Sequence, residues 1–124
     1  MIISELPSSE LQVMQYIWSQ NVKVSSKEIV EYMFEINNWK QTTTLTILSR
    51  LRKKEFLSVE KIGKYSYYKP LIEEKIYTNY ETEKFIDKFY QGSLKKLLES
   101  LKNNNKINDS ELEDIKQLLA TIEK

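Results

Sequence analysis

Apolar residues recur at steps of three and four along most of the chain, a period that predicts amphipathic helices. The first predicted helix covers residues 8–20. The second starts near Ser26, because Ser25 and Glu28 have the spacing of a capping box. The third covers residues 40–54, where leucines three apart and a basic last turn outweigh a β-branched run of threonines. The faces expected to be buried carry Leu11, Val13, Met14, Ile17 and Trp18, then Ile29, Tyr32, Met33 and Ile36, then Leu45, Leu48 and Leu51.

Between residues 56 and 68 the pattern changes to the alternation that is typical of β-strands. Apolar and polar residues alternate up to Gly63-Lys64, which supplies a turn, and a tyrosine-rich run follows. We therefore predict a β-hairpin with a basic tip at Lys61 and Lys64, closed by Pro70.

Helical periodicity returns at Ile72 and continues to the end of the chain. Gly92 interrupts the first stretch, and the asparagines at 103–105 are expected to form a loop. Asn108 and Glu111 again have the spacing of a helix cap. The pattern therefore predicts three more helices after the hairpin.

Three helices followed by a hairpin is the element order of a winged helix-turn-helix. We predict a mainly α protein with a small β wing: a winged helix-turn-helix DNA-binding domain in residues 1–70 and a three-helix C-terminal dimerisation domain in residues 71–124. Three such short helices can hardly bury a core of their own, so their apolar stripes are expected to meet a second copy of the chain. The alternative is that they fold back on the first domain. The residues expected in the dimer interface are Phe89, Leu94, Leu97, Leu98, Leu101, Ile115, Leu118, Leu119 and Ile122.

Cysteine and histidine are both absent from the 124 residues. Their absence excludes disulfides, thiolate nucleophiles, Cys/His metal sites and imidazole acid–base chemistry. Catalysis by two carboxylates in a cleft stays open from the residues alone, but we expect no catalysis, no cofactor and no metal. No apolar stretch approaches the roughly 20 residues that span a bilayer, and the chain does not start like a signal peptide, so we expect a cytoplasmic protein without membrane insertion.

The net charge of +1 conceals a strongly uneven distribution along the chain. Residues 1–39 carry two basic and five acidic side chains, residues 40–69 eight basic and two acidic, and residues 71–124 nine basic and eleven acidic. A basic block between two acidic stretches is what a polyanion-binding site would produce. The alternative is that the block is only a solvated face.

In a helix-turn-helix, the second helix of the motif enters the major groove and its N-terminal residues face base edges. Here that is the third predicted helix, and its candidate base-reading residues are Gln41, Thr42, Thr43 and Thr46. Glutamine can pair with adenine, and threonine can donate, accept or pack its methyl on thymine, which suits a site containing A·T pairs. The alternative is that the threonines only cap and solvate a helix start. With the nearby basic and wing side chains that can bind phosphates, the predicted DNA-binding residues are Lys40, Gln41, Thr42, Thr43, Thr46, Arg50, Lys53, Lys54, Lys61, Lys64 and Tyr67.

An ordered set of residues resembles a known family. The set comprises Glu10, Val13, Met14, Ile17 and Trp18, then Trp39, Thr43, Thr46, Leu48, Arg50, Leu51, Lys53, Lys54 and Phe56, then Tyr67 and Tyr68, and finally the run FIDKFYQGSLKKLL at 85–98. Over about residues 3–122, the chain is similar to the penicillinase and methicillin-resistance repressors (BlaI/MecI type).

The resemblance implies a homodimeric transcriptional repressor that binds palindromic, double-stranded operator DNA and controls β-lactamase or related antibiotic-resistance genes. In the better-known members, a membrane sensor-protease that detects β-lactams is an indirect partner, and it triggers cleavage at an Asn-Phe pair in the dimerisation region. The aligned pair here is Ser100-Leu101, which makes these two residues the possible cleavage site.

The chain departs from the family pattern at several positions. It has Lys40-Gln41-Thr42 where the family commonly has Ser-Pro-Lys, and Leu45 where a polar or basic reader is frequent. The C-terminal cysteine pairs of a copper-responsive branch are missing, so copper sensing is set aside. Two other functions stay open from the residues alone: a winged-helix protein-interaction module of the transcription machinery, and a regulator that binds a small ligand in the dimer core.

Overall fold

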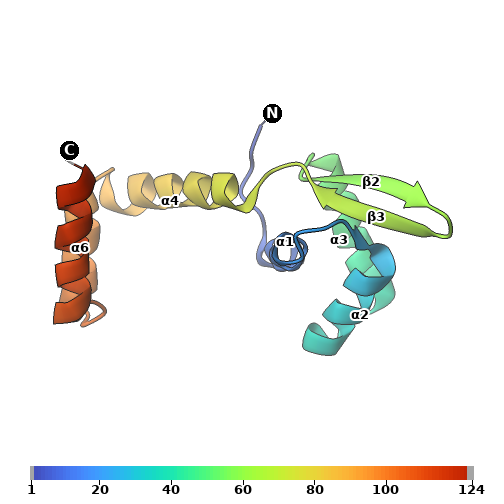
Figure 1. Ribbon diagram of the computed structural model, residues 1–124, viewed down its shortest axis with the longest axis horizontal. Coiled ribbons are helices and arrows are strands. Elements are labelled where there is room, and N and C mark those ends of the chain that lie inside the picture. The colour runs from blue at the N-terminus through green and yellow to red at the C-terminus, as the bar shows by residue number, and fades with distance from the viewer. Residues whose placement is uncertain (1, 123–124) are drawn as a thin grey trace. The chain divides into compact units, whose positions relative to one another are not determined.

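The computed structural model describes residues 2–122, which form six helices and three short strands (Figure 1). In chain order these elements are α1 (Ser8–Ser19), β1 (Val24–Ser25), α2 (Ser26–Asn37), α3 (Gln41–Lys53), β2 (Leu57–Ile62), β3 (Tyr65–Pro70), α4 (Glu74–Tyr90), α5 (Leu94–Asn103) and α6 (Asp109–Ile122). The chain divides into two compact units, one ending at Glu81 and the other starting at Thr82, so the division falls inside α4. The predicted mainly helical fold with a small wing is confirmed.

Local capping signals begin two of the helices where the sequence predicts. The backbone N–H of Glu28 donates to Ser25 Oγ at 3.1 Å, and the Ser25 hydroxyl donates to Glu28 Oε1 at 3.2 Å. The first contact is the N-cap bond of a capping box, and in the second the Glu28 carboxylate bonds the Ser25 hydroxyl in place of its backbone N–H. At the start of α6, the backbone N–H of Glu111 donates to Asn108 Oδ1 at 2.8 Å. Both caps satisfy backbone donors that a helix end leaves without partners.

The three strands form an antiparallel sheet in the order β1-β3-β2. Ile62 pairs with Tyr65, so the hairpin turns through Gly63 and Lys64 alone. Gly63 has a φ of +63°, a left-handed conformation that glycine adopts without steric cost. The hairpin is confirmed, with Pro70 as the last residue of β3, but the sequence analysis did not include the two-residue strand β1.

The core of the first unit lies between the three helices and the sheet. Its buried apolar residues are Leu6, Val13, Met14, Ile17, Val24, Ile29, Met33, Ile47, Leu48, Leu51, Phe56, Leu57, Ile72 and Tyr77. On two helices, the face that is buried differs in part from the face that the sequence predicts to be buried. On α2, Tyr32 is 37% and Ile36 50% exposed, and the Tyr32 ring stacks on Tyr16 at the surface with ring centroids 4.0 Å apart. On α3, Leu48 and Leu51 are buried as predicted, but Leu45 is 38% exposed and Thr44 is buried in its place, because positions 44, 47, 48 and 51 form the buried arc and Leu45 lies at its edge.

Among the described residues, Glu10 is the one acidic residue that is buried as a whole, only 2% exposed among apolar neighbours. The Nζ atom of Lys54, which follows the end of α3, lies 2.6 Å from Glu10 Oε1. A buried carboxylate needs such a partner, because a charge removed from water without one is strongly unfavourable. The ion pair therefore ties α1 to the end of α3.

The first turns of α4 belong to the core of the first unit. Tyr77 is 2% exposed, and its hydroxyl oxygen accepts a hydrogen bond from the backbone N–H of Leu6 at 2.8 Å. Its ring packs against Trp18 and Phe56, with centroids 5.9 and 5.6 Å away. Ile72 is buried as well. This compact unit thus extends past residue 70, where the sequence suggested a boundary, because the aromatic core is completed from α4.

Replacing Lys54 by Met is expected to lower the free energy of unfolding by about 3 kcal/mol, because it leaves the Glu10 carboxylate buried and unpaired. Replacing both partners, Glu10→Leu with Lys54→Met, should restore most of that loss. Urea unfolding followed by circular dichroism measures each value. The exposed neighbour provides the matched control: Lys53→Met should change stability by less than about 0.5 kcal/mol. Equal losses in the single and double variants would contradict the role of the ion pair.

Alkaline pH is expected to destabilise the first unit through Tyr77. Burial raises the pKa of Tyr77 above its ordinary value, and this outweighs the opposing effect of the hydrogen bond from Leu6. The folded state therefore keeps the phenol protonated while the unfolded state ionises above about pH 10, so stability is lost as pH rises through that range. Urea unfolding between about pH 8 and pH 11 should show the decline, and the slope should be shallower in Tyr77→Phe.

Candidate nucleic-acid interface

The exposed face of α3 is opposite its buried residues, and it gathers most of the predicted base readers. A shallow cleft of about 410 Å³ lies over this face. It is lined by Ser9, Trp39, Thr42, Thr43, Thr46, Ile47 and Arg50. Lys40 and Gln41 begin the helix and are exposed. Packing of the other side of α3 into the core thus holds three threonines and a guanidinium together on one solvent-facing surface.

The threonine hydroxyls on this surface differ in what they can still bond. The Thr46 hydroxyl donates to the backbone carbonyl of Thr42 at 2.8 Å. Its proton is therefore occupied, and its oxygen and methyl remain for an acceptor contact or for packing on a thymine methyl. The Thr43 side chain is exposed in the same cleft. The arrangement can distinguish base edges, whereas the flanking cations can contact phosphates.

The phosphate-binding candidates fall into two groups. Arg50 and Lys53 are exposed on α3, and Lys61 and Lys64 are exposed at the tip of the wing. Lys54 is different, because its ammonium is half-buried on Glu10 inside the first unit. The structure therefore brings four of these cations to the surface around α3 and the wing and separates the fifth from them.

The tyrosines of β3 lie on two different faces of the wing, because successive side chains of a strand point to opposite sides. Tyr68 packs against the core, where burial raises its pKa despite the lowering effect of Arg52. Tyr65 and Tyr67 lie on the opposite face of the strand. The Tyr67 ring is half-buried, with Lys23 Nζ 6.0 Å from its centroid. Tyr67 is therefore placed on the outer face of the wing, as its predicted role requires.

Sequence reasoning missed Ser9, which α1 brings into the α3 cleft, and two cations next to the wing, Lys23 and Lys27. Each is placed by a contact between segments that are distant along the chain. No local pattern could have found them, because the hydrophobic period identifies helices but does not say which surface residues of different elements become neighbours.

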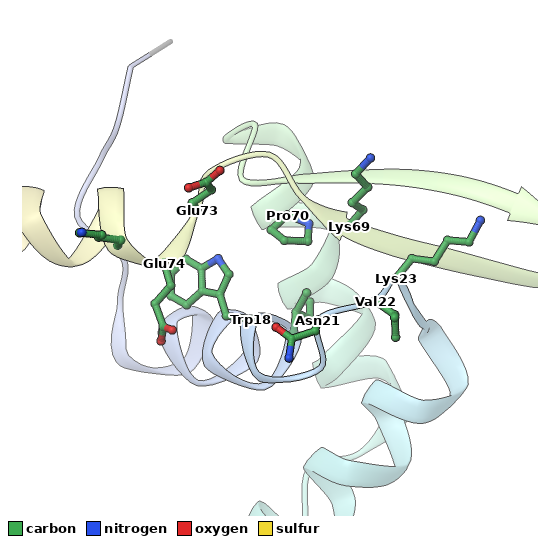
Figure 2. Close-up of a pocket in the computed structure, with 10 residues that line it drawn as sticks. Trp18, Asn21, Val22, Lys23, Lys69, Pro70, Glu73 and Glu74 are labelled. Carbon is green, nitrogen blue, oxygen red and sulfur yellow. The ribbon is translucent and has the colours of Figure 1, made fainter.

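A second hollow of about 480 Å³ lies in the first unit, where the end of α1 meets the end of β3 and the start of α4. Figure 2 labels four of its charged side chains: Glu73 and Glu74 point to opposite sides, and Lys23 and Lys69 extend away from Trp18. The Trp18 indole N–H donates to the carbonyl of Ile72 at 2.9 Å. Because its charged groups do not converge, this hollow is a structural junction and not a site for one charged ligand.

Most residues of the predicted dimer interface lie in α5 and α6, and neither helix has a buried residue in the described chain. Phe89 at the end of α4 is 56% exposed, Leu118 58% and Ile122 68%. A groove of about 400 Å³ runs between α5 and α6. Its apolar lining comprises Leu94, Leu98, Ile107, Leu112, Ile115 and Leu119. The second unit thus presents a largely uncovered apolar surface.

The possible cleavage pair, Ser100 and Leu101, lies inside α5. Ser100 Oγ is 3.3 Å from the hydroxyl oxygen of Tyr90, which donates to it. Across residues 2–122, no helix is long and apolar enough to cross a membrane. The same residues contain no cluster of three or more acidic side chains that could hold a metal ion.

Three helices packed on a small sheet, with an exposed polar helix beside a basic hairpin, define a winged helix-turn-helix protein of the DNA-binding class. The penicillinase repressor family model matches residues 6–121. The chain therefore belongs to the penicillinase repressor family. This is a family of transcriptional repressors, which confirms the prediction that the chain is not an enzyme.

Individual relatives match along nearly the whole chain. The penicillinase repressor of Bacillus licheniformis is 28% identical over 117 residues, covering 94% of this chain and 91% of the relative. The methicillin resistance regulatory protein MecI of Mammaliicoccus sciuri is 29% identical over 115 residues, covering 93% of each. The penicillinase repressor of Staphylococcus aureus is 29% identical, covering 97% of this chain and 94% of the relative.

Two solved structures resemble the first part of the chain. The solution structure of the DNA-binding domain of the repressor BlaI has a TM-score of 0.56 and 32% identity, and it covers 61% of this chain and 92% of that domain. The monomeric form of Bacillus licheniformis BlaI in complex with the blaP half-operator has a TM-score of 0.54, with the same identity and coverage. These matches confirm the predicted winged-helix fold.

Proposed function

We propose that this chain is a transcriptional repressor that binds palindromic, double-stranded operator DNA as a homodimer and controls β-lactamase or related antibiotic-resistance genes. The observation that supports it most is the exposed face of α3 over residues 42–50, in a chain whose structural relative was solved on a half-operator. In this proposal Thr43 and Thr46 read base edges, while Arg50, Lys53 and the wing-tip lysines bind phosphates. Such a repressor acts where the DNA is, in the cytoplasm of a bacterium.

Selection of bound duplexes from a randomised DNA library tests the proposal directly. The full chain is expected to enrich a palindrome with two half-sites whose centres are one helical turn, or a multiple of it, apart. Affinity for that duplex should fall steeply with salt, with a slope of about −0.9 for each neutralised phosphate. Failure to enrich any sequence, together with a flat salt dependence, would favour a protein-interaction module instead.

Substitutions on α3 should separate base reading from phosphate binding. Thr43→Ala and Thr46→Ala are expected to weaken binding to the selected operator by about 1–3 kcal/mol while leaving binding to random duplexes unchanged. Arg50→Ala should instead weaken binding to all duplexes alike and flatten the salt dependence. Ser49→Ala, an exposed change on the same helix outside the cleft, is the control. Equal losses on operator and random DNA would show that the two threonines do not read bases.

The homodimer in this proposal is formed by the apolar surface of α5 and α6. Its support is physical: exposed leucines and isoleucines in a contiguous groove are costly in water, and a second copy of the chain would cover them. Dimerisation also brings two winged helices to two half-sites at once, which raises the effective affinity without any new contact to DNA.

Replacing Leu118 by Asp is expected to weaken the dimer by at least about 2 kcal/mol, because a carboxylate would be buried in an apolar interface. Leu118 is 58% exposed within one chain, so the fold of the monomer should tolerate the change. Sedimentation velocity over a concentration series measures the dimer. Gln117→Asp adds the same charge to the neighbouring exposed position and should leave the dimer intact. A wild-type chain that stays monomeric at high concentration would refute the dimer.

Release from the operator would follow from a break in α5. In this proposal, a protease that responds to a membrane sensor cuts at Ser100-Leu101 and separates the α4–α5 part of the interface from α6. Because these residues are helical, α5 must first unfold locally to enter a protease site. An N-terminal fragment that appears after β-lactam exposure and whose mass places its last residue at Ser100 would locate the cut, and induction without any fragment would show another route.

A further inference from the structure

The first turn of α2 carries a cation in a position that the helix itself disfavours. Lys27 is the second residue of α2, and the N-terminal end of a helix has a positive partial charge that favours anions. The structure places the Lys27 ammonium over the Tyr65 ring, 6.0 Å from its centroid, and the side chain is otherwise exposed. A residue that opposes a local preference in this way points to an additional partner of negative charge.

The Tyr65 contact places Lys27 at the wing. Tyr65 directly follows the turn residues Gly63 and Lys64, so the start of α2 lies beside the hairpin, as Figure 1 also shows. A ring contact of this kind orients the ammonium without neutralising its charge. If the wing tip contacts the backbone of one DNA strand, the Lys27 ammonium is therefore close to the backbone of that DNA strand.

Lys23 repeats the arrangement one step along β3. Its Nζ atom lies 6.0 Å from the centroid of the Tyr67 ring, and Tyr67 and Tyr65 share one face of the strand because they are two residues apart. The two tyrosines that hold these cations are about 7 Å apart along the strand. This spacing is comparable to that between neighbouring phosphates of one DNA strand.

Two acidic side chains near these lysines determine whether the ammonium groups are available to bind a phosphate. Glu60 pairs with Tyr67 across the sheet, and its Oε2 atom lies 3.5 Å from Lys23 Nζ, although both side chains are about half exposed or more. An exposed ion pair of this kind is weak, so a phosphate can compete for Lys23. Glu28 is engaged elsewhere, since it accepts the Ser25 hydroxyl in the capping box.

We propose that Lys27 and Lys23, held over Tyr65 and Tyr67 at the junction of α2 and the wing, form a second phosphate-binding site for the DNA backbone, separate from the α3 face. The positive end of α2 adds to their potential. Lysines act here as point charges without base-pairing geometry, so the site adds affinity and register but no sequence preference. The proposal rests on the proposed function, because it requires that the chain binds duplex DNA.

The test uses the full chain and a random-sequence duplex of about thirty base pairs, on which only backbone contacts count. Plots of log binding constant against log salt concentration should become shallower by about 0.9 per bound protomer in Lys27→Gln, and by a similar amount in Lys23→Gln. Lys27→Arg keeps the charge and should keep the wild-type slope. Lys106→Gln, a loss of the same charge in the loop between α5 and α6, is the matched control and should not change it.

A substitution that is expected to strengthen DNA binding gives the sharpest check. Glu60→Gln removes the carboxylate that competes for Lys23, so it should tighten binding to the random duplex. Three results would each overturn the proposal: wild-type slopes in both glutamine variants, a slope in Lys27→Arg as shallow as that in Lys27→Gln, or no gain in Glu60→Gln. If the wild-type chain itself shows no salt-dependent binding to DNA, the proposed function fails, and that result is distinct from a failure of this site alone.

Discussion

The buried carboxylate of Glu10 imposes a constraint that reaches the exposed face of α3. It lies in an apolar core, and the counter-charge it needs comes from Lys54, which follows the last turn of α3. An ion pair across these two elements restricts how α3 can rotate or slide against α1. Because the opposite face of α3 carries the threonines and Arg50, the direction in which those side chains face depends on an ion pair buried on the other side of the helix.

Signals that act over a few residues were predicted well from the sequence. The caps at Ser25 and Asn108 depend on a side chain and a backbone donor three residues apart, and the hairpin turn depends on a glycine at one position. The overall order of helices and strands followed from such local rules together with the hydrophobic period. The gathering of Thr42, Thr43, Thr46 and Arg50 on one face of α3 followed as well, because a single helix determines which of its residues share a face.

Features that depend on partners distant in sequence could not be predicted in the same way. Strand β1 exists because Val24 pairs with Tyr68, and nothing in two residues of sequence indicates that pairing. Thr44 replaces Leu45 in the core because the packing of neighbouring helices sets the rotation of α3. Lys54 looked like a phosphate ligand among basic neighbours until the fold placed it on a carboxylate of α1. In each case the missing information is tertiary contact and not residue chemistry.

The insertion of Tyr77 into the core of the first unit has a consequence for how such proteins can evolve. The helix that leads out of the winged domain also completes it, through the ring contacts of Tyr77 and its hydrogen bond to the backbone of Leu6. A gene rearrangement that joined this winged domain to a different oligomerisation module at residue 70 would discard part of its core. Productive exchange must carry the first two turns of α4 along, so the natural crossover point lies within a helix and not at the loop that precedes it.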